Sequence, residues 1–191
     1  MRIVAGKYRS RVLRSLRGLD LRPTSDKLRE ALFNILGPTV EESVFVDVYA
    51  GTGAVGIEAL SRGACEAFFI EKHIAAANLI RRNLESLGVG NSANILAVDA
   101  LRGLQTLARR KFGKPLLADF VFLDPPYAQE NQYKVVLEFL DRSALLSSAG
   151  LVIAEHRKTV SLPGRLEQLE RIRVVEQGDA ALSFFRMARA A

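Results

Sequence analysis

Residues 44–60 of this chain read VFVDVYAGTGAVGIEAL, in which an apolar run, a glycine-rich turn and a second apolar run follow one another. The run at residues 44–48 predicts a buried strand, and the run from about Ala54 to Ser61 predicts a helix. Glycine is needed between a strand and a helix where the turn is tight and a ligand must approach the backbone. The stretch therefore predicts a nucleotide-containing ligand at Gly51 and Gly53.

Strands and helices alternate on both sides of this stretch. A helix capped by Thr24 or Ser25 and ended by Gly37-Pro38 comes before it. Further strands are predicted at residues 67–70, 94–98, 120–123, 151–154, 172–175 and 182–185, and further helices at residues 75–87, 101–109 and 132–140. The alternation predicts an α/β fold with a mostly parallel, doubly wound, seven-stranded sheet covered by helices on both faces. The hairpin-like connection at residues 176–179 makes the last strand antiparallel.

Length and composition favour a small soluble domain. The chain has 191 residues and is 49% hydrophobic, which suits one compact domain. It has no apolar run of the roughly 18 residues that a membrane span needs, and its first residues do not resemble a signal peptide. We expect a cytoplasmic monomer. With one cysteine and two histidines, we expect no disulfide and no bound metal.

Positive charge is concentrated at the start of the chain. The net charge is +6, yet residues 1–29 hold nine Lys or Arg against two Asp, a local charge of +7, and the remainder carries −1. Aliphatic residues interleave these charges, which favours a hairpin. We therefore expect a basic, phosphate-binding arm at residues 1–24, followed by the main domain at residues 25–191, with a flexible solvated tail as the alternative. The predicted phosphate-binding side chains are Lys7, Arg9, Arg11, Arg14, Arg22, Lys27 and Arg29.

Acidic residues at strand ends bear on the identity of the ligand. Gly51, Gly53 and Gly56 also satisfy the G-x-G-x-x-G pattern, and Glu71 lies twenty residues after the first of them, so an NAD-dependent oxidoreductase is a competing interpretation. Asp47 favours a different ligand, because a carboxylate below the loop suits an ammonium group better than a pyrophosphate. S-adenosylmethionine carries such an ammonium group. Glu71 could then accept hydrogen bonds from the ribose, and Asp99 from the adenine amino group.

The sequence Asp124-Pro125-Pro126-Tyr127 follows the buried strand at residues 120–123. Two prolines stiffen the turn, so that the Asp124 carboxylate and the Pro125 carbonyl can accept the two N–H groups of an exocyclic amine on a base. Tyr127 would stack on that base after it is flipped out. Because ligands bind at the carboxyl ends of strands, we expect this turn and the glycine loop at the same edge. The four residues predict methyl transfer to an amino nitrogen, with S-adenosylhomocysteine as the product.

The chain resembles the RsmD family, bacterial methyltransferases that modify the guanine N2 amino group in 16S ribosomal RNA. The resemblance is carried by RIVAGKYRSRVL at residues 2–13, LRPTSDKLREALFNIL at 21–36, DVYAGTGAVGIEALSRGA at 47–64, FVFLDPPY at 120–127 and GDAAL at 178–182. It implies a Rossmann-like fold that depends on S-adenosylmethionine, and a basic arm that binds RNA. The partner it implies is 16S ribosomal RNA or the assembling small subunit.

The resemblance also implies roles for individual residues. Residues 124–127 would hold the target guanine. The residues implied in cofactor binding are Asp47, Gly51, Gly53, Glu71, Asp99 and Ala100. His73 stands where the family often has Asp, and Tyr49 where Phe is common. Two further alternatives are an amino-methyltransferase acting on adenine or cytosine of DNA, which shares the DPPY sequence, and a non-enzymatic RNA-binding protein. The second would be expected to have lost the glycine loop or Asp124, and both are intact.

Overall fold

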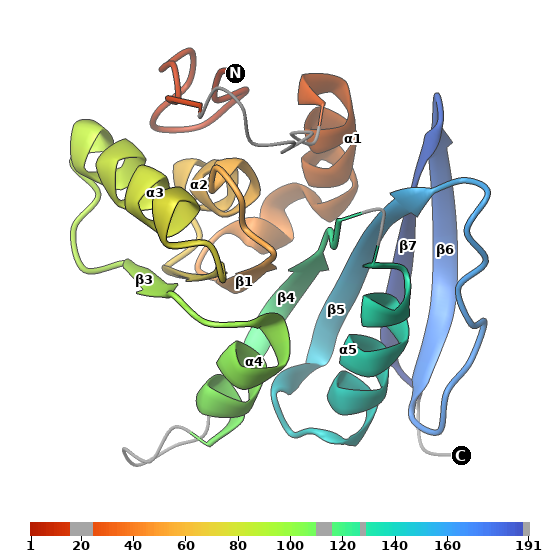
Figure 1. The fold of residues 1–191 in the computed structure, drawn as a ribbon. Helices are drawn as coiled ribbons and strands as arrows, with labels where there is room; N and C mark the ends of the chain where they lie inside the picture. Colours follow the sequence, from red (N-terminus) through yellow and green to blue (C-terminus); the bar gives the residue numbers. More distant parts are fainter. Residues whose placement is uncertain (16–24, 110–115, 127–128, 189–191) are drawn as a thin grey trace. The chain divides into compact units, whose positions relative to one another are not determined.

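The computed structural model describes residues 1–15, 25–109, 116–126 and 129–188. The chain divides into two compact units, Met1–Asp99 and Ala100–Ala191, each of which is described by itself. Figure 1 shows the elements of both units. Within the described residues, no helix has the length and apolar character needed to cross a membrane.

The first unit is built on three parallel strands in the order β3-β2-β1. Its elements are α1 (Asp26–Leu36), the short 3-10 helix η1 (Gly37–Val40), β1 (Val44–Val48), α2 (Ala54–Ser61), β2 (Glu66–Ile70), α3 (Ile74–Leu87) and β3 (Ala93–Leu96). Val48 is in register with Ile70, and Ile70 with Leu96, so the three strands end level with one another. The loops that follow β1 and β2 therefore begin at the same edge of this sheet.

Local signals explain the helix that precedes the sheet. The Ser25 side chain caps α1 by accepting a hydrogen bond from the Leu28 amide at 3.1 Å. Gly37 ends the helix with a positive φ of 57°, a conformation that glycine adopts without strain. Leu28, Leu32 and Phe33 form its buried face. The helix that was predicted between Ser25 and Gly37-Pro38 is confirmed.

The first fifteen residues pack on helices α2 and α3. Arg2 and Val12 form an antiparallel bridge, and the Ile3 amide donates to the Arg11 carbonyl at 3.0 Å. The side chains of Ile3 and Leu13 are buried in a cluster with residues of α2 and α3. The arm is therefore held by apolar contacts on one side, while most of its cationic side chains remain exposed. The predicted end of the arm at residue 24 falls within residues 16–24, which lie outside the described residues.

The second unit contains four strands in the order β4-β5-β7-β6. Its elements are α4 (Ala100–Ala108), β4 (Ala118–Leu123), α5 (Asn131–Arg142), β5 (Leu146–Arg157), β6 (Leu169–Gln177) and β7 (Ala180–Met187). β4 and β5 are parallel, whereas β7 runs antiparallel to both β5 and β6. Gly178, with a φ of 62°, turns the chain between β6 and β7. The expectation of an antiparallel last strand is confirmed.

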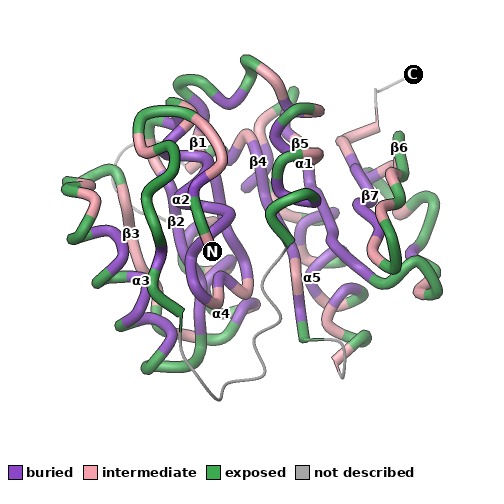
Figure 2. Tube along the Cα trace, turned by 90° about the horizontal axis from the view of Figure 1, so that it is seen from above, coloured by how far each residue is buried: buried purple, intermediate pink, exposed green. Residues whose placement is uncertain are grey.

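Burial along the strands fits the predicted α/β class. In β1 and β2 every residue after the first is buried, and β4 is buried at five of its six positions, as expected where both faces of a sheet are covered (Figure 2). All seven predicted strands are present among the described residues. The main departure is β5, which spans twelve residues instead of the predicted four. Pairing with β7 continues through Glu155 and His156, polar residues that interrupt the apolar pattern.

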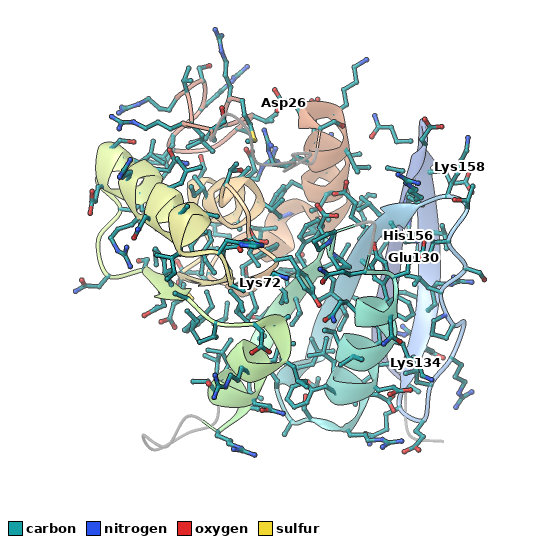
Figure 3. The ribbon with its side chains drawn as sticks, viewed as in Figure 1. Asp26, Lys72, Glu130, Lys134, His156 and Lys158 are labelled. Atoms are coloured by element: carbon teal, nitrogen blue, oxygen red, sulfur yellow. The ribbon has the colours of Figure 1, made fainter. Side chains whose placement is uncertain are left out.

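His156 illustrates how the second unit accommodates polar side chains in its core (labelled in Figure 3). It is only 3% exposed. Its Nδ1 lies 2.8 Å from the Arg157 carbonyl oxygen and its Nε2 lies 2.9 Å from the Ser183 hydroxyl. Because a carbonyl can only accept, Nδ1 carries the proton and Nε2 accepts from the hydroxyl. Burial lowers the pKa of His156, so the neutral ring is favoured.

Candidate cofactor and acceptor sites

The loop between β1 and α2 has a backbone that only certain residues tolerate. Tyr49, Gly51 and Gly53 have positive φ angles of 67°, 54° and 78°. Glycine adopts this region freely, which explains two of the three positions. A tyrosine there costs about 1–2 kcal/mol, and such strain is concentrated at functional sites. A Cβ on Gly53 would also lie 3.1 Å from a methyl carbon of Ile80 on α3.

Asp47 lies beneath this loop, near the end of β1. It is 2% exposed, and its Oδ2 accepts a hydrogen bond from the Gly56 amide in the first turn of α2 at 2.9 Å. Burial raises the pKa of the Asp47 carboxyl to about 7, the Gly56 hydrogen bond opposes this rise, and the nearby charge of Glu71 adds to it. A buried carboxyl with such a pKa favours either a proton or a cation beside it. This property fits the ammonium group predicted from the sequence.

Glu71 follows β2 and holds the loop from the other side. Its Oε2 accepts from the Gly51 amide at 2.9 Å, and its Oε1 accepts from the His73 amide at 2.7 Å. The residue is 5% exposed. A carboxylate offers about four acceptor positions, and these two bonds use two of them. Glu71 therefore shapes the loop and retains capacity to accept from hydroxyl groups of a ligand.

The third acid, Asp99, is exposed after β3, and Ala100, the first residue of α4, is buried. The charge of Asp99 acts on Tyr49: burial and this charge together raise the pKa of the Tyr49 phenol. Within the first unit, the loops after β1 and β3 therefore lie close enough for their side chains to interact. Among the described residues, no group of three or more His, Cys, Asp or Glu is arranged to hold a metal ion.

Most of the predicted phosphate-binding side chains are available to solvent. Those that are exposed are Lys7, Arg9, Arg11, Arg14 and Lys27. Arg11 spans to α3, where its Nη2 donates to the Ser86 carbonyl at 3.0 Å. Arg22 lies outside the described residues.

Arg29 was predicted to be part of this surface, and its placement corrects that prediction. It is fully buried, with Nη2 donating to the Arg2 carbonyl at 2.6 Å and to the Asp26 carboxylate at 2.9 Å (Asp26 is labelled in Figure 3). Its Nε lies 3.6 Å from Oε2 of Glu58. Residue 29 shares a helix face with Leu32, Phe33 and Leu36, so its charge is directed into the protein. This helical spacing was the sequence signal that could have revealed its burial.

Two further polar residues that the sequence interpretation missed hold the arm. Glu58 of α2 is fully buried, and its carboxylate accepts from the Val4 and Ala5 amides at 2.8 and 3.0 Å and from Arg62 Nε at 2.8 Å. Asn83 of α3, also fully buried, accepts from the Arg14 amide at 2.9 Å. Both stand among apolar residues on buried helix surfaces. A polar residue within an apolar stretch of a helix was the sequence signal that could have revealed the burial of both side chains.

The predicted acceptor turn belongs to the second unit. Asp124 is partly exposed directly after β4, Pro125 is buried and Pro126 is exposed. The Pro126 carbonyl accepts a hydrogen bond from the Gln129 amide at 2.8 Å. Tyr127 lies outside the described residues. The role of residues 124–127 in binding the target base remains a prediction.

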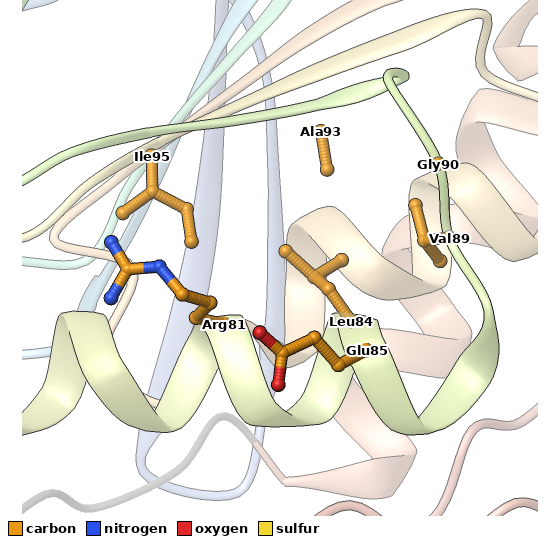
Figure 4. A pocket seen from close by; sticks show the side chains of 7 residues that line it. All are labelled: Arg81, Leu84, Glu85, Val89, Gly90, Ala93 and Ile95. Carbon is orange, nitrogen blue, oxygen red and sulfur yellow. The ribbon is translucent and has the colours of Figure 1, made fainter.

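Two surface hollows lie apart from the predicted residues. One, of about 260 Å³, lies between α3 and β3 in the first unit and includes Arg81, Leu84 and Ile95 in its lining (Figure 4). The other, of about 360 Å³, lies between α4 and α5 and includes Leu101 and Phe139. None of the predicted cofactor-binding or acceptor residues lines either hollow.

Known proteins resemble this chain along nearly its whole length. A Ribosomal RNA small subunit methyltransferase D from Escherichia coli (strain K12) is 34% identical over 163 residues, which cover 85% of this chain and 78% of that protein. A solved structure of a hypothetical protein from Thermus thermophilus superposes with a TM-score of 0.81 at 28% identity, covering 98% of this chain and 99% of that one.

A more distant solved structure shows the fold alone. It is an RNA methyltransferase from Salinibacter ruber in complex with S-adenosyl-L-homocysteine, with a TM-score of 0.63, 16% identity, and coverage of 88% of this chain and 95% of that one. Together with the superposition at 28% identity, this structure confirms the Rossmann-like fold predicted from the sequence. The family model described as conserved hypothetical protein 95 matches residues 1–186. The chain belongs to that family, the RsmD family that its sequence resembles.

Proposed function

We propose that this chain transfers the methyl group of S-adenosylmethionine to the exocyclic N2 amino group of a guanine in 16S ribosomal RNA. The name of the Escherichia coli relative supports the substrate, and the S-adenosyl-L-homocysteine ligand of the Salinibacter ruber neighbour supports the donor. The observation on which the donor depends most is the buried Asp47 carboxyl below the glycine loop, with its pKa raised to about 7. Such a site favours a cationic ligand and repels a pyrophosphate.

The residues of the first unit fit the parts of this donor. Asp47 suits the ammonium group, the acceptor capacity of Glu71 suits ribose hydroxyls, and Gly51 and Gly53 leave the loop backbone open to the amino acid moiety. Asp99 would accept a hydrogen bond from the adenine amino group. S-adenosylmethionine supplies a methyl group that its sulfonium centre already activates.

The second unit would hold the acceptor. The lone pair of an exocyclic amine is delocalised into the base, which makes the nitrogen a poor nucleophile. Accepting its two N–H groups at the Asp124 carboxylate and the Pro125 carbonyl favours a tetrahedral nitrogen whose lone pair is available. Pro126 keeps the turn stiff, and Tyr127 would stack on the flipped base. Catalysis then consists of alignment of the nitrogen with the methyl carbon and sulfur.

The arm would supply affinity for RNA. Lys7, Arg9, Arg11 and Arg14 are exposed on a segment whose backbone is fixed to α2 and α3, and Lys27 is exposed on α1. Phosphate contacts of this kind position an RNA without reading its sequence. Arg29 has no part in this surface, because its charge is used inside the protein.

The experiment that tests the reaction maps modified nucleosides in 16S ribosomal RNA by mass spectrometry. We compare a strain lacking this chain with the same strain after the wild-type chain or Asp124→Ala is restored. We expect one N2-methylguanosine to disappear and to return only with the wild-type chain. With purified protein, Asp124→Ala should lower turnover by about a hundredfold or more, by analogy with the loss of other transition-state hydrogen bonds. Its affinity for S-adenosylhomocysteine should change little.

Other outcomes would contradict parts of the proposal. Loss of a methylated adenine or cytosine would replace the guanine target, and full turnover by Asp124→Ala would remove the role of the acceptor turn. Calorimetry with NADH and with S-adenosylhomocysteine tests the donor, because binding of NADH alone would favour the oxidoreductase interpretation.

A further inference from the structure

Asn83 is a buried polar residue whose contacts lie in two segments remote in sequence from its own helix. It lies on the buried face of α3 beside Ile80 and Leu84 and is fully buried. An amide in such surroundings destabilises a protein unless its polar atoms are hydrogen-bonded. The partners of this side chain therefore indicate what it holds in place.

The Asn83 side chain makes three hydrogen bonds, which use both of its N–H donors and its side-chain oxygen. Asn83 Oδ1 accepts from the Arg14 amide at 2.9 Å, and Nδ2 donates to the Arg14 carbonyl at 3.3 Å and to the Thr52 carbonyl at 3.1 Å. Because both carbonyls can only accept, the NH₂ group must face them, and the orientation of the amide follows. An aspartate in this position could not donate to either carbonyl.

The two partners of Asn83 belong to the two surfaces with proposed binding roles. Thr52 stands between Gly51 and Gly53 in the glycine loop, where Gly51 is held in turn by Glu71. Arg14 lies near the end of the described part of the arm, and its own side chain is exposed. One buried side chain thus joins the backbone of the loop directly to the backbone of the arm.

We propose that Asn83 is a positioning residue that couples donor binding at the glycine loop to RNA binding at the arm. This inference rests on the proposed function, since it takes the loop to hold the donor and the arm to hold RNA. A ligand that orders the loop fixes Thr52 and with it the Asn83 amide, so Arg14 is ordered before RNA arrives. RNA on the arm has the reciprocal effect, because coupling between two sites is equal in both directions.

The test measures the affinity for S-adenosylhomocysteine by calorimetry, with and without a saturating uridine homopolymer. Uracil has no exocyclic amino group, so this RNA offers no acceptor for methyl transfer, while its phosphates can still bind the arm. For the wild-type chain we expect the RNA to tighten binding at least about fivefold, the lower end of usual coupling. Asn83→Ala should bring this ratio to about one. The matched control is Asn78→Ala, at an exposed position of the same helix, which should keep the wild-type ratio.

A wild-type ratio near one, or an unchanged ratio in Asn83→Ala, overturns the coupling. If both ligands bind but do so independently, only the coupling fails and the proposed function stands. If S-adenosylhomocysteine does not bind at all, both fail.

A second measurement needs no variant and therefore does not depend on whether Asn83→Ala folds. Hydrogen exchange of the Arg14 amide, which donates to Asn83, should slow when S-adenosylhomocysteine is added to the unaltered chain. An unchanged exchange rate in the saturated protein counts against the proposal.

Discussion

Asp47 is about half protonated at neutral pH when no ligand is bound, because burial raises its pKa to about 7. An ammonium group beside it would stabilise the ionised form and lower that pKa. Binding of S-adenosylhomocysteine, which carries the same ammonium group as the donor, should therefore release a proton. Affinity for this ligand should rise with pH through neutrality.

The magnitude follows from the ionised fraction of this one carboxyl. For a pKa of about 7, the ionised fraction rises from about one tenth at pH 6 to about three quarters at pH 7.5, so affinity should rise about eightfold. This holds if the bound form ionises well below pH 6. Asp47→Asn is the matched variant, because an amide oxygen can still accept the hydrogen bond from the Gly56 amide that the carboxylate accepts now. The Asp47→Asn variant has no carboxyl group at this position that could release a proton.

Calorimetry across this pH range, repeated in two buffers with different ionisation enthalpies, measures both affinity and protons released. We expect the wild-type chain to release nearly one proton at about pH 6, and Asp47→Asn to bind more weakly with no such release. A wild-type affinity that does not change with pH would refute the pairing of Asp47 with an ammonium group. The same conclusion would follow if Asp47→Asn kept the pH dependence.

Three further predictions concern stability. Arg29→Met should destabilise the protein by about 1–3 kcal/mol in urea unfolding, because the Arg2 carbonyl loses its buried donor and the Glu58 carboxylate keeps only Arg62 as a cation. Lys27→Met at an exposed site should change stability by less than about 0.5 kcal/mol, and equal effects would contradict the corrected placement. Gly56→Ala should lower the melting temperature, since its Cβ would stand 2.4 Å from a phenyl carbon of β2, whereas Gly90→Ala meets nothing within 4 Å and should not. The wild-type chain should lose stability as pH falls below about 6.5, because His156 takes up a proton more readily in the unfolded chain than in the folded one. His156→Gln should lose less stability over the same pH range, and equal loss in both proteins would exclude the histidine as the cause.

Local patterns in the sequence were sufficient to predict the elements and their order. The predicted bounds of β1 and α2 agree with the structure, because an apolar strand, a glycine turn and an apolar helix are each marked by neighbouring residues. β5 was predicted too short, since its pairing with β7 is a long-range interaction that tolerates Glu155 and His156. Hydrogen bonding between strands that are remote in sequence cannot be predicted from the local pattern of hydrophobic residues.

The sequence by itself determined the α/β class, the glycine loop with its acids Asp47 and Glu71, and the excess of positive charge near the start of the chain. Only the tertiary structure decided what each charge does. Arg29 and Glu58 lie 29 residues apart in sequence and form an ion pair inside the protein, while the other described cations of the predicted surface face solvent. The tertiary structure also raised the pKa of Asp47 by burying it. Burial and partners remote in sequence set the free energy of a charge, and neither can be read from its neighbours along the chain.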